Sequence, residues 1–118
     1  AACDLRVASK STNFAIPEVD LGIPLAWGGI QRLVREIGPA ATRELVMTCR
    51  PFTALEAHVR GMVNTVSADD AYLTDAEELA HKLARIPGPL FNTQNSIARE
   101  VPGHLKKTQR AGAGYQPT

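Results

Sequence analysis

The segment from Phe14 to Gly38, FAIPEVDLGIPLAWGGIQRLVREIG, constrains the fold of this chain most strongly. Within it, apolar residues recur at the i, i+3, i+4, i+7 spacing of one helix face: Ile30, Leu33, Val34 and Ile37. Gly28-Gly29 comes before this pattern, and Gly38-Pro39 ends it. We therefore predict a one-faced helix that begins at the paired glycines and stops at Gly38.

One carboxylate stands out in the same segment. Glu18 lies between Pro17 and Val19 in an otherwise largely apolar run. A glutamate in this position is either solvated at the end of a strand or held in a pocket where its proton can be used. The residues around Glu18 leave both interpretations open.

The flanking sequence predicts a mixed α/β chain that is mostly helical. Alternation of apolar and polar residues predicts two short strands, near residues 5–7 and 14–16, around the polar turn Ser9-Lys10-Ser11. Helices are predicted from Pro39 to about 48, with Ala41, Leu45 and Thr48 on one side, and from the Thr53–Glu56 capping box to Gly61. Later helices are predicted from about 70 to Pro87, with a stripe of Leu73, Ala76, Leu79, Ala80 and Leu83, and from 90 to 101.

These patterns divide the chain into three parts: residues 1–66, a helical region 67–101, and a tail 102–118. The tail contains no acidic residue and several glycines and prolines, so we expect a flexible basic segment. The chain begins at Ala1 without a methionine, which leaves open both a processed start and a start inside a longer protein.

Composition excludes several classes of function. The 118 residues suffice for one domain or less, and a net charge of +1 gives no indication of a nucleic acid or membrane partner. We find no membrane-length apolar run and no signal peptide. Cys3 and Cys49 have no metal-ligand spacing, so we expect two buried thiols and a reducing cytoplasm. His58, His81 and His104 are isolated, and we predict no metal site.

Several short pieces, in this order and spacing, resemble the enoyl-CoA hydratase/isomerase family, the crotonase superfamily. The pieces run from residue 1 to about 101: Ala2 to Ala8, Phe14 to Glu18, Gly22, Gly28-Gly29, Arg32-Leu33, Gly38, and Ala57 through Gly61 to Val66. The resemblance implies the C-terminal portion of a spiral of ββα units, followed by helices that pack in trimers or hexamers. It also implies that both oxyanion-hole amides and a first catalytic glutamate lie upstream of Ala1. We therefore expect this chain to be a C-terminal fragment, inactive by itself.

The resemblance also assigns roles to residues. Glu18 matches the family's catalytic glutamate, which exchanges a proton with C2 of a 2-enoyl-CoA thioester during hydration. Pro17, Ala26, Trp27 and Gly28 match substrate-binding positions, and coenzyme A enters as part of the substrate, with no separate cofactor. Members often have a small, glycine-rich sequence where this chain has Leu25-Ala26-Trp27, so Trp27 is expected to narrow the acyl pocket.

Three alternatives remain open from the sequence. The chain could be a non-catalytic remnant or assembly piece that self-associates. It could belong to an enoyl-CoA isomerase that uses Glu18 as its sole acid/base beside a separate N-terminal chain. An unrelated helical adaptor would explain the helix periodicity but not the match from Phe14 to Leu33.

Overall fold

The computed structural model describes residues 3–25 and 28–100. The predicted tail 102–118 and the positions Ala26 and Trp27 lie outside these described residues. The elements in chain order are β1 (Val7–Ser9), β2 (Asn13–Phe14), α1 (Gly29–Ile37), α2 (Pro39–Thr48), β3 (Phe52–Thr53), α3 (Ala54–Arg60), β4 (Thr65–Ser67), α4 (Tyr72–Ala84) and α5 (Gly88–Glu100). Helices α1 to α5 and strands β1 and β2 thus form within a few residues of the predicted positions, whereas β3 and β4 go beyond the two predicted strands.

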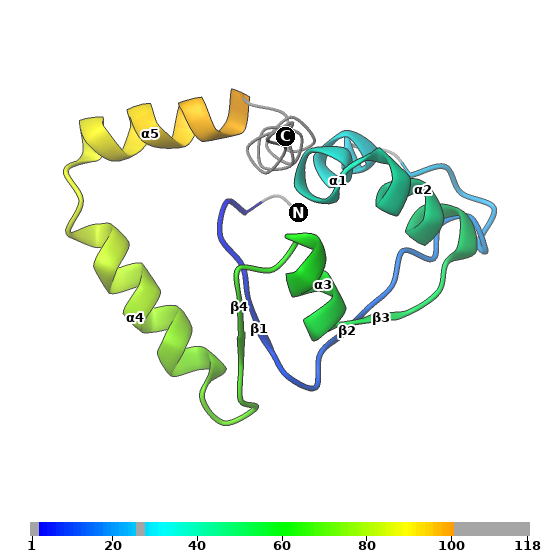
Figure 1. Ribbon diagram of the computed structural model, residues 1–118, viewed down its shortest axis with the longest axis horizontal. Coiled ribbons are helices and arrows are strands. Elements are labelled where there is room, and N and C mark those ends of the chain that lie inside the picture. Colours follow the sequence, from blue (N-terminus) through cyan, green and yellow to red (C-terminus); the bar gives the residue numbers. More distant parts are fainter. Residues whose placement is uncertain (1–2, 26–27, 101–118) are drawn as a thin grey trace, which may run out of the picture.

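The two strands nearest the N-terminus do not pair with each other. β1 pairs in parallel with β4, with Ala8 opposite Val66, while β2 pairs antiparallel with β3. The turn between β1 and β2 closes with a hydrogen bond from the Thr12 amide to the Ser9 carbonyl (3.0 Å) and sends β2 toward a different partner. A parallel pair needs a long crossover, and the segment that contains α1, α2 and α3 supplies it (Figure 1).

Helices α1 and α2 form one side of the core. Gly38 separates them at a φ of 87°, and its amide donates to the Val34 carbonyl (2.9 Å) at the end of α1. Pro39 then begins α2, where its missing N–H costs no helical hydrogen bond. The buried cluster draws on both helices and on the strands: Ala8, Leu33, Ile37, Leu45, Val46, Phe52, Ala54, Ala57 and Val63.

The buried face of α2 differs from the predicted one. Thr42, Leu45 and Val46 are buried, whereas Thr48 is exposed and Ala41 is half-buried. Thr42 can enter the core because its hydroxyl donates to the Gly38 carbonyl (2.7 Å), which satisfies the polar group. The predicted face is therefore correct for Leu45, which is buried, and for Ala41, which packs against the core, and it is wrong for Thr48. Apolar periodicity did not reveal that Thr42 is buried as well.

Helix α3 begins as the capping box predicts, but only half of the box forms. The Thr53 hydroxyl accepts from the Glu56 amide (3.1 Å), and Gly61 ends the helix at a φ of 90°. The Glu56 carboxylate turns away from the cap and binds Arg50 and Arg60. Phe14 and Phe52 stack beneath α3 at the β2–β3 pair, with ring centroids 5.5 Å apart.

In Figure 1, α4 and α5 lie on the left of β1 and β4, on the opposite side from α1, α2 and α3. α4 packs along β1 and β4, yet none of its residues is buried. The predicted stripe of Leu73, Ala76, Leu79, Ala80 and Leu83 therefore does not enter the core of the described chain. The role of this stripe in contacts with other polypeptide stays a prediction.

The buried side chain of Ser67, at the end of β4, allows a test of how packing affects the stability of the fold. The hydroxyl of Ser67 is buried and has no hydrogen-bond partner among the described residues, whereas that of Ser9, its neighbour across the ladder, lies 2.9 Å from the Thr12 hydroxyl. Since an unsatisfied buried hydroxyl is costly, Ser67→Ala should raise the free energy of unfolding in urea by about 1 kcal/mol. Ser9→Ala, the matched control, should lower it by about 0.5–1 kcal/mol. Equal losses in both variants would contradict this prediction.

Candidate functional site

The backbone after β2 folds into a compact turn that fixes Glu18. The Glu18 carbonyl accepts hydrogen bonds from the amides of Leu21 (3.2 Å) and Ile23 (2.9 Å). Gly22 supports this turn with a φ of 67°, a left-handed conformation that glycine adopts without strain. Pro17 lies in the same turn, and its carbonyl also accepts from the Leu21 amide (3.1 Å). The Pro17-Glu18 pair is thus held by the backbone.

The side chain of Glu18 is half-buried, and its Oε2 atom is buried without a hydrogen-bond partner among the described residues. A carboxylate oxygen that is removed from water without a hydrogen-bond donor is energetically costly. A bound molecule that donates a hydrogen bond to Oε2 would remove this cost. The Glu18 side chain is therefore not fully exposed to solvent in the described chain, and its role as an acid or base stays a prediction.

Apolar side chains follow Glu18 along the turn and remain exposed. Val19, Leu21 and Ile23 are each at least half exposed. The turn thus combines a buried carboxylate oxygen with an apolar exterior.

Gly28 lies at the N-cap of α1, in the left-handed conformation (φ 73°), and no side chain caps the helix. The first helical hydrogen bond runs from the Arg32 amide to the Gly28 carbonyl (3.1 Å), so the preceding amides form the positive end of α1. Leu25 packs over this end. A Cβ atom on Gly29 would come within 3.1 Å of Leu25 Cδ1, so the glycine permits the contact.

Among the predicted site residues, the structure brings Pro17 and Glu18 together in one turn and places Gly28 at the start of α1. Ala26 and Trp27, which connect the two, fall outside the described residues. The narrowing of an acyl pocket by Trp27 thus stays a prediction.

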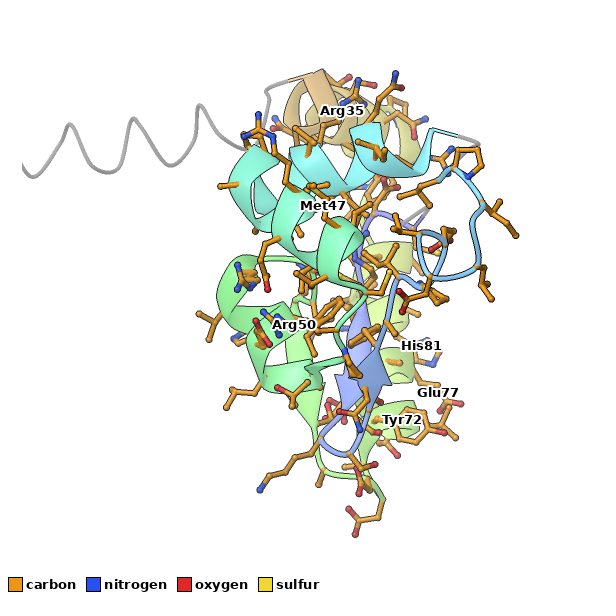
Figure 2. The ribbon with its side chains drawn as sticks, turned by 90° about the vertical axis from the view of Figure 1, so that its right-hand side faces the viewer. Arg35, Met47, Arg50, Tyr72, Glu77 and His81 are labelled. Carbon is orange, nitrogen blue, oxygen red and sulfur yellow. The ribbon has the colours of Figure 1, made fainter. Side chains whose placement is uncertain are left out.

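Sequence reasoning missed a cluster of four charged side chains that joins α2 to α3. Arg50, labelled in Figure 2, donates to both carboxylate oxygens of Glu44 and of Glu56. Arg60 donates to Glu56 (3.1 Å). The hydrogen bond from Arg50 is the main reason why the pKa of Glu56 falls to about 2 and that of Glu44 is lowered. The i, i+4 spacing of Glu56 and Arg60 is the part of the cluster that a helix pattern could have indicated. Arg50 lies between α2 and α3, six residues from both Glu44 and Glu56, and no helix pattern joins it to them.

The charge cluster predicts a loss of stability in acid. The pKa of Glu56 is about 2 in the folded chain against an ordinary value of 4.5, so folding favours the ionised form. The contribution of the Glu56 carboxylate to the stability of the fold is complete above about pH 4.5 and is lost as the pH falls toward 2. In thermal unfolding across this range, the melting temperature of Glu56→Gln should fall less steeply than that of the wild type. Glu77→Gln, on the exposed side of α4 (Figure 2), serves as control, and equal slopes for all three proteins would contradict the prediction.

Arg6 forms a second node that the sequence did not reveal. Its guanidinium forms an ion pair with Glu36 of α1 (2.8 Å) and donates to the carbonyls of Met62 and Cys3. Its backbone amide donates to the Asn64 side chain (2.9 Å). Arg6 thus joins the segment before β1 to the end of α1 and to the connection between α3 and β4.

The other histidines and cysteines considered in the sequence do not come together at one site within the described residues. His58 is exposed, with Nδ1 3.0 Å from the Val63 carbonyl, and His81 is exposed on α4 (Figure 2). Cys49 is buried as predicted, but the prediction for Cys3 was wrong: its segment lies at the surface before β1 and leaves the thiol exposed. Within residues 3–25 and 28–100, no group of three or more histidine, cysteine or acidic side chains is placed to hold a metal ion. No helix in the same ranges has the length and apolar character needed to cross a membrane.

Comparison with known proteins reveals the relatives of this fold. The chain is 43% identical over 84 residues to a short-chain-enoyl-CoA hydratase of Clostridioides difficile, a match that covers 71% of this chain and 54% of that protein. It is 39% identical over 83 residues to the 2,3-dehydroadipyl-CoA hydratase of Escherichia coli, covering 70% and 32%. The chain thus spans about a third to a half of the length of these curated relatives.

Solved structures match nearly the whole described fold. A subunit I structure from Geobacillus kaustophilus, described as an enoyl-CoA hydratase, superposes with a TM-score of 0.69 at 32% identity and covers 97% of this chain and 40% of its own. DspI of Pseudomonas aeruginosa superposes with a TM-score of 0.77 at 25% identity, covering 95% and 45%. The sequence model of the enoyl-CoA hydratase/isomerase family matches residues 1–113. From its sequence and its partial crotonase fold alike, this chain belongs to the enoyl-CoA hydratase/isomerase family.

Proposed function

We propose that this chain supplies the proton-transferring carboxylate, Glu18, to an enzyme that hydrates 2-enoyl-CoA thioesters. The observation that carries the proposal is the buried, unpartnered Oε2 atom of Glu18, held in a backbone turn. Because the chain spans about a third to a half of the length of its curated relatives, we propose that the rest of a crotonase domain completes the site.

In the proposed reaction, the oxygen of a water molecule bonds to C3 of the thioester while a carboxylate outside this chain takes a proton from that water, and the electrons of the C2–C3 double bond move toward the thioester oxygen. Glu18, in its protonated form, then gives its proton to C2, and the electron pair on the oxygen re-forms the carbonyl double bond. The proton taken from the water returns to Glu18 through solvent, which restores both carboxyl groups. Charge on that oxygen requires preorganised donors, and each is worth about 2.7–4 kcal/mol in comparable sites. We place these donors, and a second carboxylate that orients the water, in the part of the domain outside this chain.

An isomerase is the second candidate, and the same observation supports it. A single unpartnered carboxylate could take a proton from C2 and return it to C4, which moves the double bond without adding water. A non-catalytic assembly role is the third, and the lack of any buried residue in α4 favours it. For the setting we propose acyl-CoA or fatty acid metabolism in the cytoplasm, since the two unpaired cysteines suit a reducing compartment.

The test is complementation. The purified chain is mixed with the part of the Clostridioides difficile relative that lies outside the match, and loss of the enoyl thioester absorbance is followed with a short 2-enoyl-CoA. We expect hydration by the mixture and none by either component alone. Hydration by this chain alone would contradict the proposed division of the site, and a shifted double bond without water uptake would select the isomerase. A tight complex with no turnover would favour the assembly role.

A further inference from the structure

The backbone of residues 18–23, here called the Glu18 turn, forms a Schellman motif, the hydrogen-bond pattern that commonly ends a helix. The Ile23 amide donates to the Glu18 carbonyl (2.9 Å), and the Gly22 amide donates to the Val19 carbonyl (3.0 Å). In this motif the residue that makes the second of these bonds is left-handed. Gly22 occupies that position with a φ of 67°.

The end of α3 contains the same motif. There the Met62 amide donates to the Ala57 carbonyl (2.8 Å), and the Gly61 amide donates to the His58 carbonyl (3.0 Å). Gly61 is left-handed as well, with a φ of 90°. That motif follows a helix, whereas residues 15–25 form no helix or strand. The Glu18 turn therefore forms without a helix to support it.

Tertiary packing contributes little to the Glu18 turn. Val19, Leu21 and Ile23 are 51%, 65% and 54% exposed. A segment with few buried side chains opens at a low cost in free energy, so its own backbone preferences decide how often it is closed. A Cβ atom on Gly22 would meet no atom of the described residues within 4 Å. A small side chain at this position therefore changes only the cost of the left-handed conformation.

We propose that Gly22 is a positioning residue, whose left-handed conformation closes the Glu18 turn and holds the Glu18 Oε2 atom in its buried place. Its effect on the reaction rests on the proposed function, in which Glu18 transfers the proton. The Glu18 carbonyl is the acceptor at one end of the motif, so the motif fixes the backbone from which the carboxyl group extends. When Gly22 leaves the left-handed region, this hydrogen bond breaks and Oε2 loses its buried position.

The first measurement follows the Glu18 carboxyl group in this chain by itself. A water-soluble carbodiimide and an amine convert accessible carboxyl groups to amides, and tandem mass spectrometry gives the labelling rate of Glu18 relative to that of exposed Asp20. Gly22→Ala should raise this ratio at least about threefold, because the left-handed conformation costs alanine a factor of about 5–30 in population. Gly22→Asn should raise the ratio less than half as much, because asparagine enters this region more readily.

Gly61→Ala is the matched control, since it places the same strain in the same motif away from Glu18. A Cβ atom on Gly61 lies 3.4 Å from the Glu36 carbonyl oxygen, an ordinary contact. This variant should lower the urea midpoint but keep the labelling ratio within about 1.5-fold of the wild type. An unchanged ratio in Gly22→Ala would overturn the proposal, and so would an equal rise in Gly61→Ala or in Gly22→Asn. If circular dichroism shows that Gly22→Ala is unfolded, Gly22→Asn against the wild type decides, with a ratio raised by about 1.5-fold or more expected.

The second measurement uses the complemented enzyme. Gly22→Ala should lower kcat at least about threefold with KM nearly unchanged, because a displaced carboxyl group slows proton transfer more than it weakens binding. Gly22→Asn should restore most of the loss. In the Glu18→Gln background, Gly22→Ala should lower the residual turnover less than about twofold, because the group that it positions is gone. Losses that multiply in the double variant would overturn the proposal, since Gly22 would then act independently of Glu18.

The outcomes separate this inference from the proposed function. Full turnover by Glu18→Gln rejects the function, and the labelling ratio still decides whether Gly22 holds the carboxyl group in place. Turnover that depends on Glu18, together with an unchanged labelling ratio in Gly22→Ala, rejects the positioning role and leaves the function standing.

Discussion

Replacement of Glu18 by glutamine should lower the turnover of the complemented enzyme by about 10²–10⁴, the usual contribution of a general acid–base group. Glutamine preserves the shape of the side chain and its place in the turn but cannot exchange a proton. The buried Oε2 position would then hold an amide or carbonyl group with no partner among the described residues. The apparent Michaelis constant should change little, because Glu18 acts on the transition state more than on the bound substrate.

The control for this experiment is Asp20→Asn. Asp20 lies in the same turn but is exposed, so its neutralisation changes the local charge equally without touching a buried oxygen. Turnover of this variant should stay within about twofold of the wild type. Should Glu18→Gln retain full turnover in an active complex, Glu18 would have no part in proton transfer, whatever its position.

Replacement of Leu45 by alanine should cost about 2–5 kcal/mol of unfolding free energy, the range found for fully buried leucines. Leu45 on α2 is completely buried, at the centre of the cluster that joins both helices to β3 and α3. Truncation leaves a cavity that the close packing around it can fill only in part. Because domains of this size are stable by only about 5–15 kcal/mol, this loss should shift the urea midpoint strongly or unfold the chain.

Met47 provides the comparison for Leu45, two residues away on the same helix. Its side chain is 71% exposed (Figure 2), so Met47→Ala removes a similar volume from the surface and should cost less than about 0.5 kcal/mol. Both variants are measured by urea unfolding followed by circular dichroism. Similar losses would mean that α2 does not anchor the core in the way its burial indicates.

The local signals of the sequence predicted the helices well. Gly38-Pro39 separates α1 from α2 and Thr53 caps α3 because these residues act on backbone groups within a few positions. Local signals of this kind did not predict that Thr42 lies on the buried face of α2. There, the bond from Thr42 to Gly38 allows a polar residue into the core, and apolar periodicity carries no information about it.

Some features of the candidate site could also be predicted from the sequence, and others could not. The Pro17-Glu18 pair and the paired glycines were recognisable because family motifs are contiguous in the chain. The burial of Glu18 Oε2 was not, since solvent access depends on everything packed around the atom. The contacts of Arg50 and of Arg6 also had no sequence signal, because these side chains meet their partners only after the backbone folds.

The sequence by itself determined where the helices begin and end, because glycine, proline and capping residues act over one turn of backbone. It also determined to which family the chain belongs, because the family motifs are contiguous in the chain. The tertiary structure decided which strands pair, which side of α2 is buried, and where apolar side chains remain uncovered. Arg6 and Asn64 are 58 positions apart, and Leu5 meets Leu90 across one groove. Contacts of this range depend on the path of the whole backbone, which no local pattern of residues specifies.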